Sequence, residues 1–488
     1  MTASPIDPTG ELRELASDCV HCGFCLPACP TYQLWGEEMD SPRGRIHLIS
    51  QLLDGGQASE AAASHLDRCL GCMACVPACP SGVRYDRLIE AARSWQEEPP
   101  RAAPGAAGPA GAGPAGAAGA TGRPPAPVPP RSARARAARA AIFATFPYPR
   151  RLRLLTGPLK MAQRTGLNRR IGRSPLAGRL APELVASLRV APAPGHGQHR
   201  LAAGRVPAEG PRRAVVGMLT GCVQQVFFPG VNEATARLLA AEGCDVVIPA
   251  GQGCCGALSL HSGRVAEAAR FARRTIAAFE AADVDVIVVN SAGCGSAMKE
   301  YGELLRHAGE GPDGGDWAPR AAQAAAKVRD LSEYLAELAA SDEGPRGARH
   351  PLEVTVAYHD ACHLGHAQRI KQQPRDLLRA IPGLRLAELA DGGTCCGSAG
   401  VYNLLQPEAA GQLGALKAQA VLATGAPLVV SANPGCSLQI ASAMAAAGAG
   451  QPPAVAHIAE VLDASLRGLP VSSLTGGSQP ESSGSQPE

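Results

Sequence analysis

The chain has 488 residues, of which 45% are apolar, and its formal net charge is +3. This length exceeds what one ordinary hydrophobic core serves, so we expect two or three domains. No apolar run approaches the roughly 18 residues of a membrane span, and the N-terminus lacks the basic start and apolar centre of a signal peptide. We therefore expect a cytoplasmic protein, in which 17 cysteines indicate metal or redox chemistry rather than disulfides.

Residues 1–95 contain two dense cysteine motifs, CVHCGFCLPACP and CLGCMACVPACP. Both match C-x2-C-x2-C-x3-C-P, in which three thiolates on a tight loop bind one [4Fe-4S] cubane and the fourth completes the partner cluster. Zinc sites use paired C-x2-C units and need neither the third cysteine nor the proline. We therefore expect two [4Fe-4S] clusters. The expected ligands are Cys19, Cys22, Cys25 and Cys79 for cluster 1, and Cys69, Cys72, Cys75 and Cys29 for cluster 2. Between the motifs, SPRGRIHLISQLL predicts a turn followed by a helix.

A low-complexity basic linker with short helices is expected over residues 96–210. Within it, residues 97–140 are rich in Pro, Gly and Ala, which predicts disorder. Residues 101–182 hold 14 Arg, one Lys and no acid, a charge of +15 that leaves −12 on the rest of the chain. The apolar and basic residues of 141–184 favour short helices that lie on a lipid surface or, alternatively, on the protein's own acidic domains.

From residue 211 onward, short apolar runs such as AVVGML and VDVIVVN alternate with Ala-rich helical stretches. This alternation predicts an α/β fold with a largely parallel sheet. The pattern also repeats: AVVGMLTGC matches VTVAYHDAC, GQGCCG matches GGTCCG, and DVIVVNSAGC matches PLVVSANPGC, at offsets of 140 to 142 residues. We therefore expect two homologous domains, 211–345 and 346–467, and a disordered tail over 468–488.

Each repeat supplies four cysteines from three sites, at least two of them just after predicted strands, where parallel sheets place ligand sites. Glycines at 253, 256, 393 and 397 would permit the backbone turn around each paired cysteine. Four converging thiolates suit an additional iron–sulfur cluster or zinc; buried free cysteines are the alternative. The candidate ligands are Cys222, Cys254, Cys255, Cys294, Cys362, Cys395, Cys396 and Cys436. Cys244 has no counterpart in the second repeat and is expected in the core. The histidines around Cys362 are absent from the first repeat and are expected to be structural: His359, His363 and His366.

Twin ferredoxin motifs, a basic linker and two cysteine-rich CCG domains together resemble the iron–sulfur subunit family of glycolate oxidase (glycolate dehydrogenase). The resemblance is carried by SPRGRI, NEATARLLAAEGC, GQGCCGAL, VVNSAGCGSAMKEYG, YHDACH, QQPRDLLRAIPG, CCGSAGVYNLLQPE and NPGC. It covers about 1–95 and 211–467, and the linker does not contribute. It implies a multidomain fold: an α-helical ferredoxin module with two [4Fe-4S] clusters, followed by two homologous α/β cysteine-rich domains.

The resemblance further implies an electron-transfer subunit of an oxidoreductase, with no catalytic residue of its own. A flavin-bearing partner subunit would oxidise glycolate to glyoxylate, and the acceptor would be a quinone or another carrier. We expect no nucleic-acid partner, and we expect a cytoplasmic protein, with peripheral contact on the inner face of the membrane through 141–184 as an option.

Two alternatives remain open at this point. One is a related anaerobic glycerol-3-phosphate or lactate dehydrogenase complex, and the other is an enzyme of the heterodisulfide-reductase type. The CCG domains of that reductase usually end in C-x2-C, whereas this chain has only GCGSA at Cys294 and GCSLQ at Cys436. A third reading makes the CCG domains zinc-stabilised docking scaffolds.

Overall fold

The computed structural model describes residues 10–56, 58–97, 129, 131–192, 201–309, 311, 314–390, 392–448 and 451–475. Two compact units divide the chain: Met1–Ala141 with Leu258–Ala268, and Ile142–Ala257 with Ala269–Glu488. We call the first the ferredoxin unit and the second the cysteine-rich unit, and each is described by itself. Most of the segment expected to be disordered, 97–140, lies outside the described residues.

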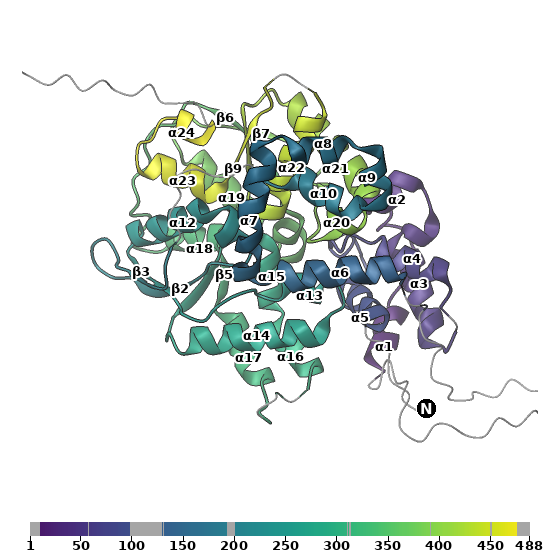
Figure 1. The fold of residues 1–488 in the computed structure, drawn as a ribbon. Helices are drawn as coiled ribbons and strands as arrows, with labels where there is room; N and C mark the ends of the chain where they lie inside the picture. The colour runs from purple at the N-terminus through teal and green to yellow at the C-terminus, as the bar shows by residue number, and fades with distance from the viewer. Residues whose placement is uncertain are drawn as a thin grey trace, which may run out of the picture. The chain divides into compact units, whose positions relative to one another are not determined.

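The ferredoxin unit is helical, and its elements are purple in Figure 1. They are α1 (Glu11–Ser17), α2 (Pro30–Trp35), the 3-10 helix η1 (Glu38–Asp40), α3 (Pro42–Leu53), α4 (Glu60–Asp67) and α5 (Tyr85–Glu97). The turn and helix expected from SPRGRIHLISQLL are confirmed as α3. The Ser41 side chain accepts a hydrogen bond from the Gly44 amide at 3.0 Å, and Pro42 occupies the first helical turn. Both features favour a helix start at this point.

The core of this unit lies between α3, α4 and α5. Ile46, Ile49, Leu88 and Ile89 recur at helical spacing on α3 and α5 and are buried. Cys69 and Cys75 belong to the same apolar cluster. The two cysteine loops are thus held against a packed core rather than on a free surface.

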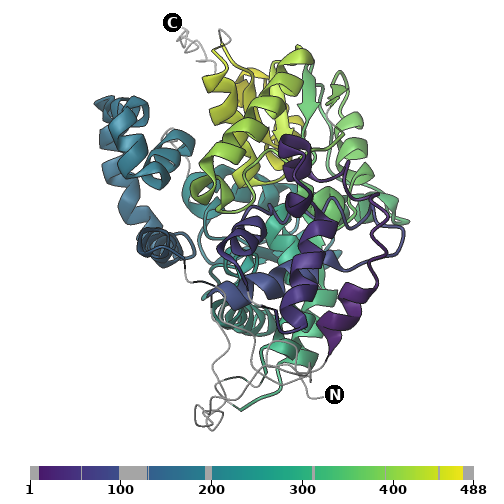
Figure 2. The ribbon, with the colours of Figure 1, turned by 90° about the vertical axis from the view of Figure 1, so that its right-hand side faces the viewer.

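Helices also occupy most of residues 133–190 of the linker, as expected for 141–184. They are α6 (Ala133–Thr145), α7 (Pro149–Arg164), α8 (Leu167–Arg173), α9 (Pro175–Leu180) and α10 (Pro182–Val190). Disorder was expected up to residue 140, but helix α6 already begins at Ala133. The expectation was therefore wrong for residues 133–140. The sequence of α6 is dominated by Ala and Arg, which have high helix propensity, and the helix buries Ile142 and Phe143. Helices α7 to α10 pack as one blue group in Figure 2.

The first sheet of the cysteine-rich unit has the strand order β1-β3-β2-β4-β5. Its strands are β1 (Gly204–Val206), β2 (Ala214–Leu219), β3 (Cys244–Ile248), β4 (Val286–Val289) and β5 (Val328–Asp330). Only the edge strand β1 is antiparallel to its neighbour. The main crossover and covering helices are α12 (Pro229–Ala241), α14 (Val265–Glu280), α15 (Ala292–Lys299) and α18 (Leu331–Ala340). The largely parallel α/β sheet is therefore confirmed here.

The second sheet is fully parallel and has the order β7-β6-β8-β9. Its strands are β6 (Thr355–Tyr358), β7 (Arg385–Glu388), β8 (Leu428–Ser431) and β9 (Ala454–His457). The order matches β3-β2-β4-β5 of the first sheet strand for strand, as two copies of one fold require. All four residues of β8 are buried, which is typical of a central parallel strand covered on both faces.

The two sheets share one continuous apolar core. Helix α12 packs against α23 (Ile458–Leu466), and α18 packs against α19 (Gln372–Arg379). Because α12 and α19 follow equivalent strands, as do α18 and α23, these two contacts are equivalent by an approximate two-fold relation. An ion pair strengthens one of them, with Arg237 Nη2 lying 2.7 Å from Asp463 Oδ2.

The C-terminal residues 468–475 are part of this core rather than of a disordered tail, which corrects the expectation for that stretch. Leu469, Val471 and Leu474 pack against the core, and Ser472–Thr475 form the short helix α24. The apolar side chains at alternating and helical spacing explain the docking, because they remove apolar surface from water. The low-complexity repeat over 476–488 lies outside the described residues.

Across the parts of the chain that the structure describes, no helix combines the length and the apolar character needed to cross a membrane.

Candidate metal centres

A pocket in the ferredoxin unit is lined by the four cysteines expected to bind cluster 1. Three come from the first motif and the fourth, Cys79, comes from the end of the second. Cys22 is exposed, and Cys19, Cys25 and Cys79 are partly buried. Ile46, Val83 and Tyr85 supply apolar wall, and Cys75 also lines the pocket. Four thiols around one pocket are the donor set that a [4Fe-4S] cluster requires, so these residues fit the group.

The cysteines expected to bind cluster 2 are all buried: Cys29, Cys69, Cys72 and Cys75. Burial raises the pKa of Cys75 well above its ordinary value, and the charges of the nearby thiols Cys72, Cys69, Cys29 and Cys25 raise it further. Cys29 of the first motif therefore lies within electrostatic range of the second motif. A set of buried, mutually repelling thiols is a site for a positively charged iron centre, which offsets the repulsion.

Both cysteine loops adopt the same backbone conformation. In the first loop His21 and Gly23 have φ values of 54° and 89°, and in the second Gly71 and Met73 have 67° and 60°. These left-handed residues occupy equivalent positions, two and four residues after the first cysteine. His21 and Met73 pay the steric cost of this conformation, on the order of 1–2 kcal/mol each. Such strain is typical of a loop whose geometry is set by a bound group.

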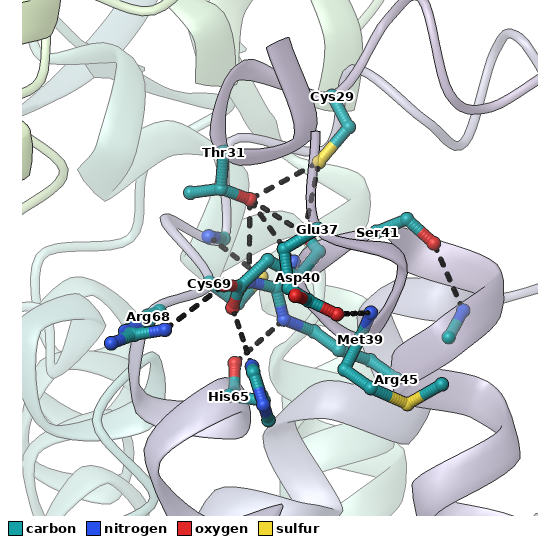
Figure 3. A network of polar contacts seen from close by, with 12 residues as sticks. Cys29, Thr31, Glu37, Met39, Asp40, Ser41, Arg45, His65, Arg68 and Cys69 are labelled. Carbon is teal, nitrogen blue, oxygen red and sulfur yellow. Dashed lines mark hydrogen bonds and ion pairs between the residues drawn. The ribbon is translucent and has the colours of Figure 1, made fainter. Parts of the chain in front are cut away.

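A buried charge network around Asp40 lies beside Cys29 and Cys69, two of the cysteines expected to bind cluster 2 (Figure 3). The Asp40 side chain is 1% exposed, and its carboxylate contacts Arg45 Nη2 at 3.1 Å, His65 Nδ1 at 3.0 Å and Arg68 Nη1 at 3.1 Å. Arg45 is equally buried. The Asp40 carboxylate thus has cationic or hydrogen-bonding partners on several sides, as a charge taken out of water requires.

Thr31 connects this network to a cysteine. Its hydroxyl donates to the Asp40 carbonyl oxygen at 2.8 Å and accepts from both terminal nitrogens of Arg45 at 3.2 Å. The Cys29 sulfur lies 3.3 Å from the same hydroxyl and 3.6 Å from the Asp40 carbonyl oxygen (Figure 3). The network therefore fixes the rotamer of Cys29.

Cys69 has its own polar surroundings. The Tyr85 hydroxyl donates to the Cys69 sulfur at 3.4 Å, and the Arg93 guanidinium donates to the Cys69 carbonyl oxygen. Burial acts to raise the pKa of Cys69, but the Arg45 and Arg93 cations together with hydrogen bonds from Tyr85 and the Gly71 amide hold that pKa below its ordinary value. The thiolate is therefore favoured at this position, and the thiolate is the form that binds metal.

The first cysteine-rich domain brings its four cysteines together at the carboxyl edge of the sheet. Cys222 follows β2, Cys254 and Cys255 lie in the loop after β3, and Cys294 lies in the first turn of α15 after β4. Cys254 is hydrogen-bonded to Cys222 and Cys255, and these contacts together with burial raise its pKa well above the ordinary value. Cys294 is hydrogen-bonded to Cys255.

The second domain repeats this arrangement at the ends of β6, β7 and β8. Cys395 is hydrogen-bonded to Cys362 and Cys396, and Cys436 is hydrogen-bonded to Cys396. The contacts from Cys395 and Cys436 lower the pKa of Cys396 well below its ordinary value. The eight candidate cysteines therefore form two sets, one in each domain, while Cys244 lies apart in β3 with its sulfur 4.0 Å from the Tyr334 hydroxyl.

Three of the four glycines expected to permit the turns around the paired cysteines adopt the left-handed conformation. Gly256 and Gly397, directly after each pair, have φ values of 92° and 87°, and Gly393 has 80°. A Cβ on Gly397 would also lie 2.8 Å from the Ala410 carbonyl oxygen. Gly253 does not adopt the left-handed conformation, and Gly251 has it instead with φ 81°. The turn in the first loop is thus made two residues earlier than the motif indicated.

His359, which the sequence analysis expected to be structural, lies beside two of these cysteines. It follows β6 directly, is 1% exposed, and its ring lies with Cys396 and Cys436 so that the three ligand atoms are all within 4.8 Å of one another. His366 instead has a ring nitrogen 3.4 Å from the Gly393 carbonyl oxygen. The sequence did contain a signal for this position of His359. The residue directly follows a predicted strand, and the carboxyl ends of the strands form the edge of the sheet that carries the cysteines.

Comparison with known families agrees with this geometry. A model of a 4Fe-4S dicluster domain matches residues 15–83, and a model of a cysteine-rich domain matches twice, over 216–299 and 356–441. A model of the glycolate oxidase iron–sulfur subunit linker region matches 134–190. This last match corrects the expectation that the linker does not contribute to the resemblance: the helices α6 to α10 within it form a defined structure.

Individual relatives match over most of the chain. It is 36% identical over 451 residues to the probable glycolate oxidase iron-sulfur subunit of Bacillus subtilis (strain 168), covering 91% of this chain and 93% of that protein. It is 32% identical over 436 residues to the glycolate oxidase iron-sulfur subunit of Escherichia coli (strain K12), covering 89% and 91%. Lactate utilization protein A of an Exiguobacterium species is 32% identical over 253 residues, 52% of this chain and 98% of that protein.

The ferredoxin motifs, the helical linker and the paired cysteine-rich domains thus each match a family model, two relatives match about nine tenths of the chain, and the chain belongs to the family of the glycolate oxidase iron–sulfur subunit.

Proposed function

We propose that the chain is the iron–sulfur electron-transfer subunit of a glycolate oxidase (glycolate dehydrogenase) complex. In this proposal a flavin-bearing partner subunit oxidises glycolate to glyoxylate, and this chain passes the electrons to an acceptor such as a quinone. The observation that carries the proposal is the ferredoxin unit, where the four thiols assigned to cluster 1 line one pocket although they come from two motifs. The two glycolate oxidase relatives support the choice of substrate.

The cysteines have distinct roles in this proposal. Cys19, Cys22, Cys25 and Cys79 hold cluster 1, and Cys69, Cys72, Cys75 and Cys29 hold cluster 2. A [4Fe-4S] cluster accepts and releases electrons one at a time, which links a two-electron flavin to a one-electron chain. The exposed Cys22 marks the face of the ferredoxin unit where a partner can approach. The cysteines of cluster 2 are buried, which keeps water from the second site, and Arg45 and Tyr85 favour the thiolate of Cys69.

The cysteine-rich unit is proposed to hold a further metal group, either iron–sulfur or zinc, and to dock the partner or the final acceptor. Supporting this role, each domain places four cysteines at the carboxyl edge of a parallel sheet, where ligand sites of such sheets lie. No residue of this chain is assigned a catalytic role, because the proposal places substrate oxidation in the partner.

A lactate-oxidising complex is the second candidate. It is favoured by the match to lactate utilization protein A, which this chain covers over 98% of that protein's length. The two candidates share the ferredoxin unit and differ in the partner that supplies electrons.

The test is to purify the chain with its native partners and offer glycolate, lactate and glycerol 3-phosphate in turn under anaerobic conditions. Reduction of the clusters is followed by electron paramagnetic resonance. Glycolate should produce the signal of reduced [4Fe-4S] clusters. A signal with lactate alone would replace the first candidate by the second, and clusters that stay oxidised with all three substrates would refute both.

We further propose that the protein is cytoplasmic and contacts the inner face of the membrane through 141–184. Helix α7 supports this, because it exposes Leu154 (77%), Leu155 and Met161 on a helix that carries five cationic side chains and no acid. Apolar residues beside cations favour anionic lipid. The Leu154→Glu, Leu155→Glu double variant should then co-sediment less with vesicles containing phosphatidylglycerol, whereas Leu416→Glu, at an exposed leucine of α21 (Pro407–Ala423), should not. If the wild-type protein bound neutral vesicles as well as vesicles containing phosphatidylglycerol, the proposed preference for anionic lipid would be wrong.

A further inference from the structure

His359, Cys396 and Cys436 form the tightest group of potential metal ligands in the described part of the chain. Their ligand atoms all lie within 4.8 Å of one another, and no other set of three His, Cys, Asp or Glu side chains among the described residues has this spacing. The three residues come from the ends of β6, β7 and β8 and are all buried. The sheet therefore brings them together from positions far apart in the sequence.

The imidazole of His359 is buried with the cysteines rather than paired with other polar groups. No oxygen or nitrogen atom of the described residues is a hydrogen-bond partner of either ring nitrogen, although the side chain is 1% exposed, and the ring contacts the Cys396 thiol instead. A buried polar atom without a full hydrogen-bond partner carries an energetic cost. A metal ion bound to one ring nitrogen would remove part of that cost. The backbone of His359 is in place independently, since its amide donates to the Val430 carbonyl oxygen at 2.9 Å.

The sister domain shows that the fold itself does not need a histidine here. In the alignment of AVVGMLTGC with VTVAYHDAC, His359 corresponds to Leu219, which is buried at the end of β2. An apolar side chain therefore fills the equivalent space in the first domain. The imidazole in the second domain is a departure from that apolar packing, and the two cysteine sets are chemically different.

The distances between the ligand atoms also distinguish a site for a single metal ion from a site for an iron–sulfur cluster. In a cubane each cysteine binds a different iron, so the four sulfurs stand well apart. The ferredoxin cysteines, which surround a pocket, do not meet the 4.8 Å spacing among the described residues. Four ligands around one zinc ion, at about 2.3 Å for sulfur and about 2.0–2.1 Å for nitrogen, lie roughly 3.5–4 Å from one another. The group at His359 is close to that second arrangement.

We propose that the second cysteine-rich domain binds a single zinc ion through His359, Cys396 and Cys436, with Cys362 or Cys395 as the fourth ligand. A mixed sulfur and nitrogen set is one that zinc prefers. The inference deepens the proposed role of the cysteine-rich unit and rests on it for the metal-binding role of the cysteines. Because zinc has no redox chemistry, the electron path of the proposed function then does not pass through this site.

The test compares the full chain with two variants at one position. His359→Leu installs the residue that the first domain has, and His359→Cys replaces one zinc ligand by another. Zinc content is measured by elemental analysis and its ligands by X-ray absorption at the zinc edge. Wild type should show nitrogen and sulfur ligands, His359→Leu should lose that zinc, and His359→Cys should retain zinc with sulfur ligands only.

His366→Leu is the matched control, because His366 lies in the same segment but contacts a backbone oxygen rather than the cysteines. It should keep zinc and the nitrogen ligand. The proposal is overturned if wild type holds no zinc, if its zinc has no nitrogen ligand, or if His359→Leu keeps the same zinc with the same ligands. The ferredoxin clusters are monitored in the same samples by electron paramagnetic resonance. Their signal should be equal in all variants, and its absence in wild type would count against the proposed function rather than against the zinc site.

Discussion

The Ser291 hydroxyl lies 3.2 Å from the Asn433 side-chain oxygen and joins the two cysteine sets of the cysteine-rich unit. Asn433 also donates from its side-chain nitrogen to the Cys436 sulfur at 3.5 Å, and Ser291 is hydrogen-bonded to Cys294. Two side chains therefore connect a cysteine of one domain to a cysteine of the other. Nearby, the Ala292 amide donates to the Ala432 carbonyl oxygen at 3.1 Å. The two sites are neighbours across the approximate two-fold relation.

Asn433→Ala tests this connection. The substitution removes the Asn433 side-chain bonds to the Ser291 hydroxyl and to the Cys436 sulfur, so it should lower the free energy of unfolding of this unit by about 1–3 kcal/mol. The measurement is thermal unfolding followed by circular dichroism. Ser473→Ala removes an exposed hydroxyl bonded only to a local carbonyl and should be close to neutral. Equal stability of the two variants would show that the connection does not hold the domains together.

Cys29→Ser tests the exchange of the fourth ligand between the motifs. Cys29 follows the first loop in sequence, yet the charge of its thiol acts on Cys75. The variant should therefore lose or convert cluster 2 and leave cluster 1 intact, as measured by iron content and by electron paramagnetic resonance.

A control for this experiment is available in the same chain. Cys244→Ser alters a buried cysteine that lies beside Tyr334 rather than beside the candidate ligands, so the iron content should stay at the wild-type level. Loss of cluster 1 alone in Cys29→Ser would mean that each motif supplies all four ligands of its own cluster.

Asp40→Asn removes the negative partner of a buried cation. Arg45 is 1% exposed and would be left without its carboxylate, a change that typically costs about 3–5 kcal/mol. The ferredoxin unit should then release its clusters at a lower denaturant concentration, which visible absorption records. Asp54→Asn affects a carboxylate that pairs with Arg13 at the surface and is 64% exposed, so its cost should stay below about 1 kcal/mol. Similar midpoints for the two variants would contradict the importance of the buried network.

Tyr85→Phe removes the hydroxyl that donates to the Cys69 sulfur at 3.4 Å. Hydrogen bonds to cysteine sulfur stabilise the more negative, reduced cluster and so raise its potential. Loss of about 1 kcal/mol from such a bond corresponds to roughly 40 mV for a one-electron couple. The variant should lower the potential of cluster 2 by that order in a redox titration. Tyr32→Phe, at another tyrosine of the unit, should leave the potential unchanged, and an unshifted Tyr85→Phe would refute the effect.

His457 gives the cysteine-rich unit a defined pH dependence. Burial lowers the pKa of His457 to about 4, below the ordinary value of 6.5, and its Nδ1 accepts from the Ala459 amide at the start of α23. The unfolded chain therefore binds a proton more readily than the folded chain between these values. The stability contributed by neutral His457 is complete above pH 6.5 and is lost as the pH falls toward 4, by about 3 kcal/mol.

His457→Asn should flatten this part of the profile, because asparagine also caps a helix but does not titrate. The measurement is the denaturation midpoint at several pH values between 4 and 7. His307→Asn, at an exposed histidine, serves as the control and should keep the wild-type slope. A wild-type slope in His457→Asn would show that other groups cause the pH dependence.

Local patterns in the sequence were sufficient for much of this protein. The C-x2-C-x2-C-x3-C-P spacing predicts cluster ligands because three thiolates on one short loop need no distant contact to converge. The repeat of cysteines at 140 to 142 residues likewise indicated two copies of one α/β fold. Strand and helix periodicity within each copy located β2, β4, α12 and α14.

The remaining features depend on contacts between residues far apart in sequence, which local patterns do not encode. Helix α6 begins inside a stretch whose composition predicted disorder, and Leu469, Val471 and Leu474 dock onto a core that the tail sequence does not reveal. The position of His359 beside Cys396 and Cys436 follows from the order of strands β7-β6-β8, which sets the end of one strand beside the ends of its neighbours. The sequence determined the cysteine motifs and their repeat, because these are local patterns, and the packing of the sheets decided which side chains meet.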